Sequence, residues 1–402
     1  MRHGALRLLA RGDRPRVVSK QLIGVGVLGA GRIGERVVGY LRSNPRVGVL
    51  AVYNRSPERL GEVAARFGAK AFDSWEALLG SHDIDLVLVT TSNDLHAVLA
   101  TSALQHHKAV LCEKPMATSA SDAVAMVQTA RHNEMFLQIG FELRYSRLYR
   151  TVRRWIDDGL LGEVVLTSCS YISSAFWLPG AWRARPEHSG GVVGEKLSHY
   201  IDIARWWTDA AVLEVYAAAA PNVVPAYGVH DNVQLTMRFV GGAVSHISFA
   251  MGLASWTPTD PLQHPEPHFR DSGHELRNLV QGTRGAAMTD VFGRVAERWS
   301  LDQTTGHSVS KLVEQVEWRA EDDEEYFHNI AGEVSDVVAR VAEGRLPLVP
   351  PEDALASTLA CFAAEESLAT GRPVSLADIA GRTGLSHTAW TGSESPGAGT
   401  DG

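Results

Sequence analysis

The chain has 402 residues, of which 45% are apolar and 21% charged, so its composition is that of a folded protein and excludes wholesale disorder. The net charge of −8 comes from 46 acidic and 38 basic residues, and the sequence contains no dense block of lysine and arginine. We therefore do not expect nucleic acid as the main partner. This length predicts two or three domains. Three widely spaced cysteines fit a reducing compartment without a zinc or disulfide framework: Cys112, Cys169 and Cys361.

The two ends of the chain differ in composition from the rest. The first twenty residues carry five arginines, and their apolar run from Gly4 to Ala10 is broken by Arg7. We therefore expect a disordered extension over residues 1–20 rather than a secretory signal, and a disordered Ser/Thr/Gly-rich tail over 386–402. No stretch of about eighteen uninterrupted apolar residues occurs, so we expect no membrane span and a cytoplasmic protein.

Short apolar runs alternate with helical patterns between residues 21 and 145. Strands are predicted at 22–28, 47–53, 85–90, 109–112 and 136–140, and helices begin near Gly31, Ser56, Asn93 and Ser119. Strands without polar alternation, separated by helices, are typical of a parallel sheet covered on both faces. The sequence predicts a doubly wound, dinucleotide-binding Rossmann domain.

The rhythm changes over residues 146–385. A helix is predicted at 147–157, then strands at 163–173, 212–219, 232–240 and 243–251, the last two forming a hairpin at Gly241-Gly242. Further helices are predicted at 195–207, 324–343 and 351–370. Strands grouped beside a few helices predict an α+β domain with a large, mainly antiparallel open sheet.

A glycine-rich turn follows the first predicted strand and reads Gly29-Ala30-Gly31-Arg32-Ile33-Gly34. Gly29 permits a tight turn, Gly31 lets the backbone approach a pyrophosphate, and Gly34 lets helix and strand pack closely. The helix N-terminus supplies N–H donors and partial positive charge. The whole turn, Arg32 and Ile33 included, therefore predicts a dinucleotide site.

The choice between NAD and NADP is made near the end of the second strand, about twenty residues further on. The sequence there is Asn54-Arg55-Ser56, without the carboxylate that would bind the ribose 2′-hydroxyl of NAD. Arg55 can pair with a 2′-phosphate and Ser56 can donate to it, so we expect NADP over NAD. The alternative is that Arg55 is a solvated turn residue and that Asn54 holds NAD.

Two further motifs carry candidate chemistry. Glu113-Lys114-Pro115 ends a parallel strand, where ligands bind in doubly wound sheets, although an ordinary surface lysine is the alternative. On the helix at 195–207, Glu195, His199 and Asp202 share one face at 100° per residue. A histidine between two carboxylates suits proton transfer, whereas the alternative is a solvated polar face.

In this order, the Gly29–Gly34 turn, the Glu113-Lys114-Pro115 triplet and the Gly190-Gly191…His199-x-x-Asp202 helix resemble the Gfo/Idh/MocA oxidoreductase family. The loop 91–96 also resembles the family's loop after the fourth strand, and the similarity covers residues 22–380. The resemblance implies a Rossmann domain and an α/β domain whose open sheet often forms the oligomer interface. A homodimer or homotetramer is therefore expected.

The resemblance also implies residue roles. Lys114 matches the family lysine that contacts the reacting hydroxyl, and His199 matches the acid/base histidine. Glu195 replaces the aspartate of the best-known members, which moves the carboxylate by about 1 Å or more, and it is expected to orient His199. Asp202 is expected to hold His199 or a substrate hydroxyl. Further cofactor contacts are assigned to Thr91, Asn93, His96, Glu113 and Arg183.

Several other residues invite a function without fixing one. His264, His268 and His274 lie in a proline-rich loop, but the cysteines and compact spacings of structural zinc sites are absent, so we expect no metal there. The loop is expected at a substrate rim or an interface. Three aromatic residues can stack on a sugar or belong to the core: Tyr171, Trp177 and Trp182.

Together these features predict an enzyme that moves a hydride between nicotinamide and a secondary alcohol or ketone of a sugar, cyclitol or related polyol. In reduction, His199 assisted by Lys114 would protonate the forming alkoxide. Two alternatives remain: a non-catalytic NADP-binding regulator, and an enzyme that uses tightly bound NAD for internal redox in epimerisation or glycoside cleavage.

Overall fold

The computed structural model describes residues 20–175, 177, 180–252, 273–302 and 309–385. Its N-terminal half contains a six-stranded sheet whose neighbouring strands are all parallel, in the order β3-β2-β1-β4-β5-β6. This is the doubly wound arrangement that the sequence predicts. The strands are β1 (Ile23–Leu28), β2 (Val47–Tyr53), β3 (Lys70–Ala71), β4 (Leu86–Val89), β5 (Ala109–Glu113) and β6 (Leu137–Gly140).

Helices cover both faces of this sheet because each central strand is apolar on both sides. Along β4, Leu86 and Leu88 join one buried cluster while Val87 and Val89 join the other. Helix α2 begins with Ser56 capping the N–H of Arg59, as predicted. The helices of the first half are α1 (Arg32–Arg42), α2 (Pro57–Phe67), α3 (Trp75–Gly80), α4 (His96–Gln105) and α5 (Ala120–His132).

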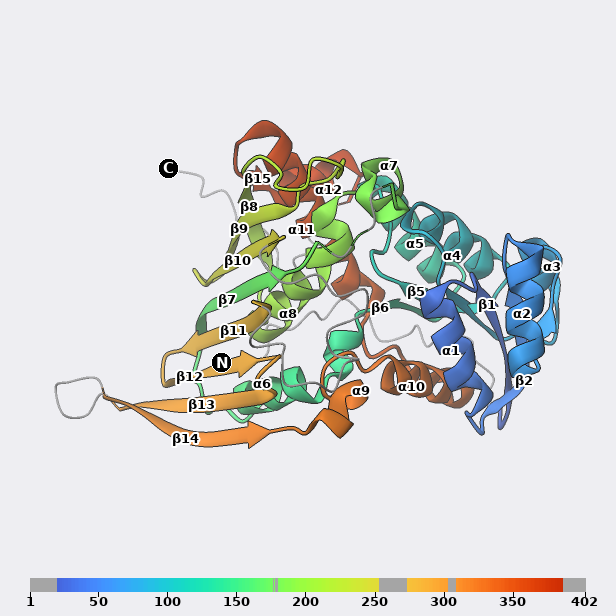
Figure 1. Ribbon diagram of the computed structural model, residues 1–402, viewed down its shortest axis with the longest axis horizontal. Coiled ribbons are helices and arrows are strands. Elements are labelled where there is room, and N and C mark those ends of the chain that lie inside the picture. Colours follow the sequence, from blue (N-terminus) through green and yellow to red (C-terminus); the bar gives the residue numbers. More distant parts are fainter. Residues whose placement is uncertain (1–19, 176, 178–179, 253–272, 303–308, 386–402) are drawn as a thin grey trace, which may run out of the picture.

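Helix α10 (Ile330–Glu343) belongs by sequence to the second predicted domain but packs on the first sheet, beside α1 (Figure 1). It buries Val334, Val337 and Val338 in the cluster that also contains Val25 of β1. The chain therefore returns to its nucleotide-binding half near its end. Although α10 follows residue 145, where the second domain is predicted to begin, it packs against the first sheet.

The second sheet has nine strands in the order β14-β13-β12-β11-β7-β10-β9-β8-β15. All neighbouring pairs are antiparallel except β7 and β10, which are parallel. The strands are β7 (Val164–Ser173), β8 (Val212–Ala218), β9 (Asn232–Phe239), β10 (Val244–Met251), β11 (Glu275–Gly282), β12 (Gly285–Asp290), β13 (Val295–Asp302), β14 (Val309–Glu317) and β15 (Val374–Ser375). The sequence patterns predict only β7 to β10 of these strands.

Among the described residues, helices cover one face of the second sheet and none covers the opposite face, called the open face below (Figure 1). Alternate residues of β7 to β12 are buried under the helices, as expected for a sheet with one covered face. No helix among the described residues is long and apolar enough to cross a membrane. The covering helices are α6 (Arg147–Asp157), α8 (Ser198–Thr208), α11 (Pro351–Thr370) and α12 (Leu376–Arg382).

Short helical segments join the two halves and depart from two predicted long helices. The helix predicted at 195–207 begins only at Ser198 in the structure, and a π-helical stretch, Val193–Leu197, takes the place of its first turn. The helix predicted at 324–343 is divided into α9 (Asp323–Tyr326) and α10. The remaining segments are the 3₁₀ turns η1 (Asn93–Leu95), η2 (Glu142–Tyr145), η3 (Trp182–Ala184) and η7 (Ala320–Asp322), and helix α7 (Pro186–Ser189).

Candidate active site

The glycine-rich turn before α1 has the geometry of a phosphate cradle. Gly29 has a φ of 101°, and a Cβ there would lie 2.9 Å from the carbonyl oxygen of Thr90. A Cβ on Gly34 would lie 1.8 Å from the carbonyl oxygen of Gly29, so helix and turn pack too closely for a side chain. A Cβ on Gly31 would meet nothing within 4 Å. This open space at the N-terminus of an eleven-residue helix fits a dinucleotide pyrophosphate.

The loop after β2 contains the residues that would meet the adenosine ribose. Oδ1 of Asn54 accepts the N–H of Ala30 at 3.0 Å, which ties this loop to the glycine-rich turn. Ser56 Oγ accepts the N–H of Arg59 at 3.3 Å. Arg55 is exposed and forms no ion pair with the described residues, so its guanidinium is available to a phosphate.

The loop after β4 is fixed by a buried histidine. The two ring nitrogens of His96 lie 2.7 Å from the carbonyl oxygen of Pro115 and 3.3 Å from that of Thr91. Burial lowers the pKa of His96, so its ring is neutral and its single N–H donates to one of these carbonyl oxygens. These contacts place His96 between the loop after β4 and the loop after β5.

Lys114 and Glu195 join three segments that are distant in the sequence. Lys114 Nζ, at the end of β5, donates to the backbone oxygen of Glu195 at 2.6 Å. The Glu195 carboxylate accepts from Asn93 Nδ2 at 2.9 Å and from Arg183 Nε at 2.8 Å. Burial alone would raise the pKa of Glu195, but Lys114 and Arg183 lower it, so the carboxylate is ionised.

The expected stripe of Glu195, His199 and Asp202 on one α-helix is not what the structure contains. The π-helical stretch 193–197 changes the rotation per residue, and such bulges are frequent at functional sites. Glu195 binds Asn93 and Arg183 rather than His199. All three side chains are buried, so the alternative of a solvated face is also wrong.

Asp202 was expected to hold His199 or a substrate hydroxyl, and its contacts differ from that expectation. Arg144 donates to both of its carboxylate oxygens, and Ser357 donates to Oδ1 at 2.8 Å. Arg144 also lies 2.6 Å from Asp353, which in turn pairs with Arg205. Asp202 therefore belongs to a buried ion-pair network between α8 and α11.

His199 faces a carboxylate that the sequence analysis did not identify. Its Nε2 lies 3.3 Å from Oε1 of Glu142, which directly follows β6 and Phe141. The same oxygen is 2.8 Å from Nδ1 of His328. Burial lowers the pKa of His199 to about 3, partly opposed by Glu142, so the ring is neutral near pH 7. Within the described residues, His199 Nδ1 has no hydrogen-bond partner.

Two more carboxyl groups lie close to this pair. Burial and the charge of Glu142 raise the pKa of Glu113 to about 8, with Lys114 opposing the shift. Burial, Glu142 and Glu113 likewise raise the pKa of Glu333. Both groups are therefore protonated at neutral pH, and Glu113, at the end of β5, is a potential hydrogen-bond donor to a ligand.

Comparisons with known proteins agree with this arrangement. Residues 23–141 match the model of the oxidoreductase family with an NAD-binding Rossmann fold, GFO_IDH_MocA, and residues 149–287 match the GFO/IDH/MocA C-terminal domain. The chain belongs to the Gfo/Idh/MocA family. It is therefore an oxidoreductase that uses a nicotinamide dinucleotide.

Relatives and solved structures extend over most of the chain. An inositol 2-dehydrogenase of Acidothermus cellulolyticus is 25% identical over 348 residues, 86% of this chain and 92% of the relative. A 1,5-anhydro-D-fructose reductase of Ensifer adhaerens is 32% identical over 226 residues, 55% and 67% of the two chains. A levoglucosan dehydrogenase in complex with NADH and levoglucosan has a TM-score of 0.72, at 21% identity over 89% of this chain and all of that one. At this level of identity, the similarity to levoglucosan dehydrogenase shows a shared fold.

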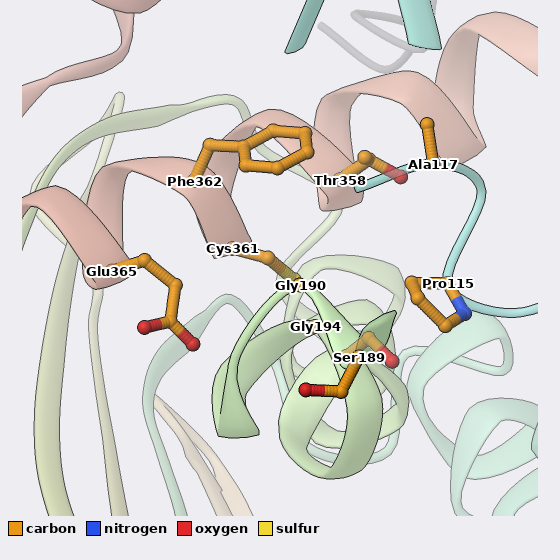
Figure 2. A pocket seen from close by; sticks show the side chains of 10 residues that line it. Pro115, Ala117, Ser189, Gly190, Gly194, Thr358, Cys361, Phe362 and Glu365 are labelled. Atoms are coloured by element: carbon orange, nitrogen blue, oxygen red, sulfur yellow. The ribbon is translucent and has the colours of Figure 1, made fainter. Parts of the chain in front are cut away.

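In this member of the Gfo/Idh/MocA family, the second glycine-rich segment packs against α11. Glu365 reaches from α11 towards it and accepts the N–H of Val193 at 2.8 Å (Figure 2). A Cβ on Gly191 would lie 2.2 Å from Oε1 of Glu365, which explains the glycine. A small cavity between these segments is lined by Pro115, Ala117, Ser189, Gly190, Gly194, Ser198, Thr358, Cys361, Phe362 and Glu365.

The predicted aromatic and histidine candidates have structural contacts. Tyr171 is buried and packs against Tyr200 and Phe249, so it belongs to the core. Trp177 packs against Tyr227, and the Arg183 guanidinium stacks over Trp182 with 4.3 Å to the ring centroid. His274 accepts the N–H of Ser174, while His264 and His268 lie outside the described residues. Among the described residues, no cluster of ligands could hold a metal ion.

Proposed function

We propose that this enzyme oxidises a secondary hydroxyl of a cyclitol or sugar, or reduces the corresponding ketone, with NADP(H). The observation that carries the proposal is a neutral, buried His199 within electrostatic reach of Lys114, whose ammonium is fixed at the carboxyl end of the parallel sheet. Relatives named inositol 2-dehydrogenase and 1,5-anhydro-D-fructose reductase support a polyol or sugar substrate.

The chemistry follows from the charge and protonation of these side chains. A bound nicotinamide would supply the hydride acceptor in oxidation and the hydride donor in reduction. His199, whose neutral ring has one nitrogen with a free lone pair, takes the hydroxyl proton during oxidation and returns it during reduction. Lys114 keeps two N–H donors beyond its bond to Glu195, and its charge stabilises the alkoxide in this buried site.

The cofactor assignment rests on the cradle and on the loop after β2. The open space at Gly31 and the N–H groups of α1 would hold the pyrophosphate. Arg55 would pair with the 2′-phosphate of NADP, since it is exposed and no carboxylate in the described part of the chain pairs with it. Asn93 and Arg183, both fixed by Glu195, would border the nicotinamide.

A cofactor-monitored screen tests this function. Myo-inositol, its keto form, 1,5-anhydro-D-fructose and levoglucosan would each be offered with NADP(H) and with NAD(H), and absorbance at the nicotinamide band followed. We expect turnover with at least one polyol or its ketone, faster with NADP(H). Stoichiometric NAD that stays bound through gel filtration, without net turnover, would instead indicate internal redox use.

A further inference from the structure

Two histidines share one carboxylate oxygen next to the proposed base. His199 Nε2 lies 3.3 Å from Oε1 of Glu142, and His328 Nδ1 lies 2.8 Å from the same atom. The exposed fractions of the His199 and Glu142 side chains are 7% and 8%, whereas that of His328 is 33%. Nothing assigned so far explains why a carboxylate is buried between two imidazoles.

Building on the role of His199 proposed above, we propose that Glu142 is the positioning carboxylate of the His199 base and that His328 fixes Glu142. The protein thus uses Glu142, at the end of the last parallel strand, where the family resemblance pointed to Glu195. The Glu195 carboxylate binds Asn93 and Arg183 instead, and Glu142 is the carboxylate in contact with the His199 ring.

The surroundings of Glu142 keep it charged. Burial alone would raise its pKa, but His199, His328 and Lys114 lower the pKa of Glu142 to about 2. Its carboxyl neighbours Glu113 and Glu333 have raised pKa values and carry the protons instead. An ionised carboxylate only accepts hydrogen bonds, so it favours the His199 tautomer with hydrogen on Nε2.

That tautomer leaves the lone pair on Nδ1, which is buried and without a hydrogen-bond partner among the described residues, so the proposal requires a bound substrate to place its hydroxyl against this atom. During oxidation, the proton of the substrate hydroxyl would move to Nδ1, and the hydride of the carbinol carbon would pass to a bound oxidised nicotinamide dinucleotide, which leaves the ketone. His199 becomes an imidazolium, and the negative charge of Glu142 stabilises it across the 3.3 Å contact. The contact is long for a hydrogen bond, and such contacts shorten when substrate binds.

Neighbouring structure holds Glu142 and His328 in place. Phe141 packs edge-on against the His199 ring, with 6.0 Å between centroids. Asn329, next to His328, caps helix α10 and donates to the backbone oxygen of Tyr145 at 3.1 Å. The His328 ring therefore approaches Glu142 from a loop that is anchored to η2 itself.

The test uses the intact enzyme and begins without substrate. In protein labelled with ¹⁵N-histidine, the His199 signals are assigned by their loss in His199→Gln. We expect a neutral ring with hydrogen on Nε2 at pH 7, and a mixed or reversed tautomer in Glu142→Gln. An unchanged tautomer in Glu142→Gln would overturn the proposal, because a merely structural Glu142 would leave the ring as it is.

Kinetics with NADP⁺ and whichever polyol the screen identifies give the second readout. Glu142→Gln should lower kcat by about 10²-fold to 10⁴-fold, with the KM for NADP⁺ unchanged, because the wrong tautomer faces the substrate. Glu142→Asp should recover part of this loss, and His328→Ala should lower kcat about tenfold. His328→Ala and Glu142→Asp keep the test decisive if Glu142→Gln does not fold.

Glu333→Gln is the matched control, since it removes a buried carboxyl of the same cluster that is already protonated. It should leave kcat within about twofold. If His199→Ala is inactive while Glu142→Gln retains full kcat, the positioning role fails and the proposed function stands. If His199→Ala retains full activity, the proposed function itself fails.

Discussion

Arg144 donates two hydrogen bonds of 2.7 Å to Asp202, one to each carboxylate oxygen. The pair is almost fully buried, and Asp202 and Asp353 hold the pKa of Arg144 above its ordinary value even though burial lowers it. This carboxylate is therefore committed to the interface between α8 and α11. Its spacing of three residues from His199 reflects the architecture of the helix more than the chemistry of the site.

The first prediction is that Asp202→Ala destabilises the fold. Removing one partner leaves the Arg144 guanidinium buried, with Asp353 as its remaining partner, and such losses typically cost about 3–5 kcal/mol. Urea unfolding of the variant measures this cost. Where the variant is folded, kcat should stay within about threefold of the unmodified enzyme. A large loss of kcat at unchanged stability would contradict this prediction and indicate that Asp202 takes part in the reaction.

The contrast between Asp202 and Glu142 shows what the sequence could predict. Strand-and-helix order, the glycine-rich turn and Lys114 follow from local patterns, and five of the six parallel strands lie where those patterns placed them, whereas the two-residue β3 was not predicted. The prediction that Glu195, His199 and Asp202 share one helical face was wrong, because a rotation of 100° per residue assumes a regular α-helix and the structure has a π-helical stretch there. Glu142 had one usable signal: it is an acid directly after the last parallel strand, where ligands bind. Its partner His328 comes from 186 residues further along the chain, which no local pattern shows.

The second prediction concerns the proton-transfer unit. His199→Ala and Lys114→Ala should each lower kcat by about 10²-fold to 10⁴-fold while NADP binding is retained. The double variant should lose little more than the worse single variant, because residues that act as a unit fail together. Steady-state rates at saturating cofactor measure these losses, and fluorescence titration measures cofactor binding. Additive losses would mean that the two side chains act independently.

The third prediction concerns cofactor choice. Arg55→Ala should weaken NADP binding by about tenfold to hundredfold and leave NAD binding unchanged, since Arg55 is expected to meet only the 2′-phosphate. Arg66→Ala is the control, because that arginine already pairs with Glu35. Calorimetric titration with both cofactors measures the affinities. Equal affinities for NAD and NADP in the unmodified protein would contradict the assignment.

The fourth prediction is self-association through the open face of the nine-stranded sheet. Met288 and Leu279 are register partners on β12 and β11, and Tyr216 lies on the same open face at β8. Exposed apolar side chains along this face favour association with a second copy of the chain, which would bury them. Light scattering should give two or four times 43.6 kDa. Met288→Arg should lower that mass, whereas Val98→Arg, on an exposed site of α4, should not. A mass of 43.6 kDa for the unmodified protein would contradict the prediction.

The last prediction concerns pH and stability at Glu365, which is buried against the second glycine-rich segment. Burial raises the pKa of Glu365 to about 7, from 4.5 in the unfolded chain, and the N–H of Val193 opposes the shift. Between these values the folded state binds more protons than the unfolded state, so this group stabilises the fold below pH 4.5 and the contribution is lost as pH rises through 7. The full loss is on the order of 3 kcal/mol.

Glu365→Gln removes this titration while keeping an oxygen that can accept from Val193. We expect the unfolding free energy of the unmodified protein to fall relative to that of Glu365→Gln between pH 5 and pH 8, measured by urea unfolding at each pH. Other buried groups, Glu113 and His199 among them, titrate in both proteins and cancel in the difference. Glu366→Gln, at the exposed neighbouring position that pairs with Arg382, should leave the pH dependence of the unmodified protein unchanged. Parallel curves for Glu365→Gln and the unmodified protein would mean that Glu365 is ionised throughout this range, held by the N–H donors of the glycine-rich segment.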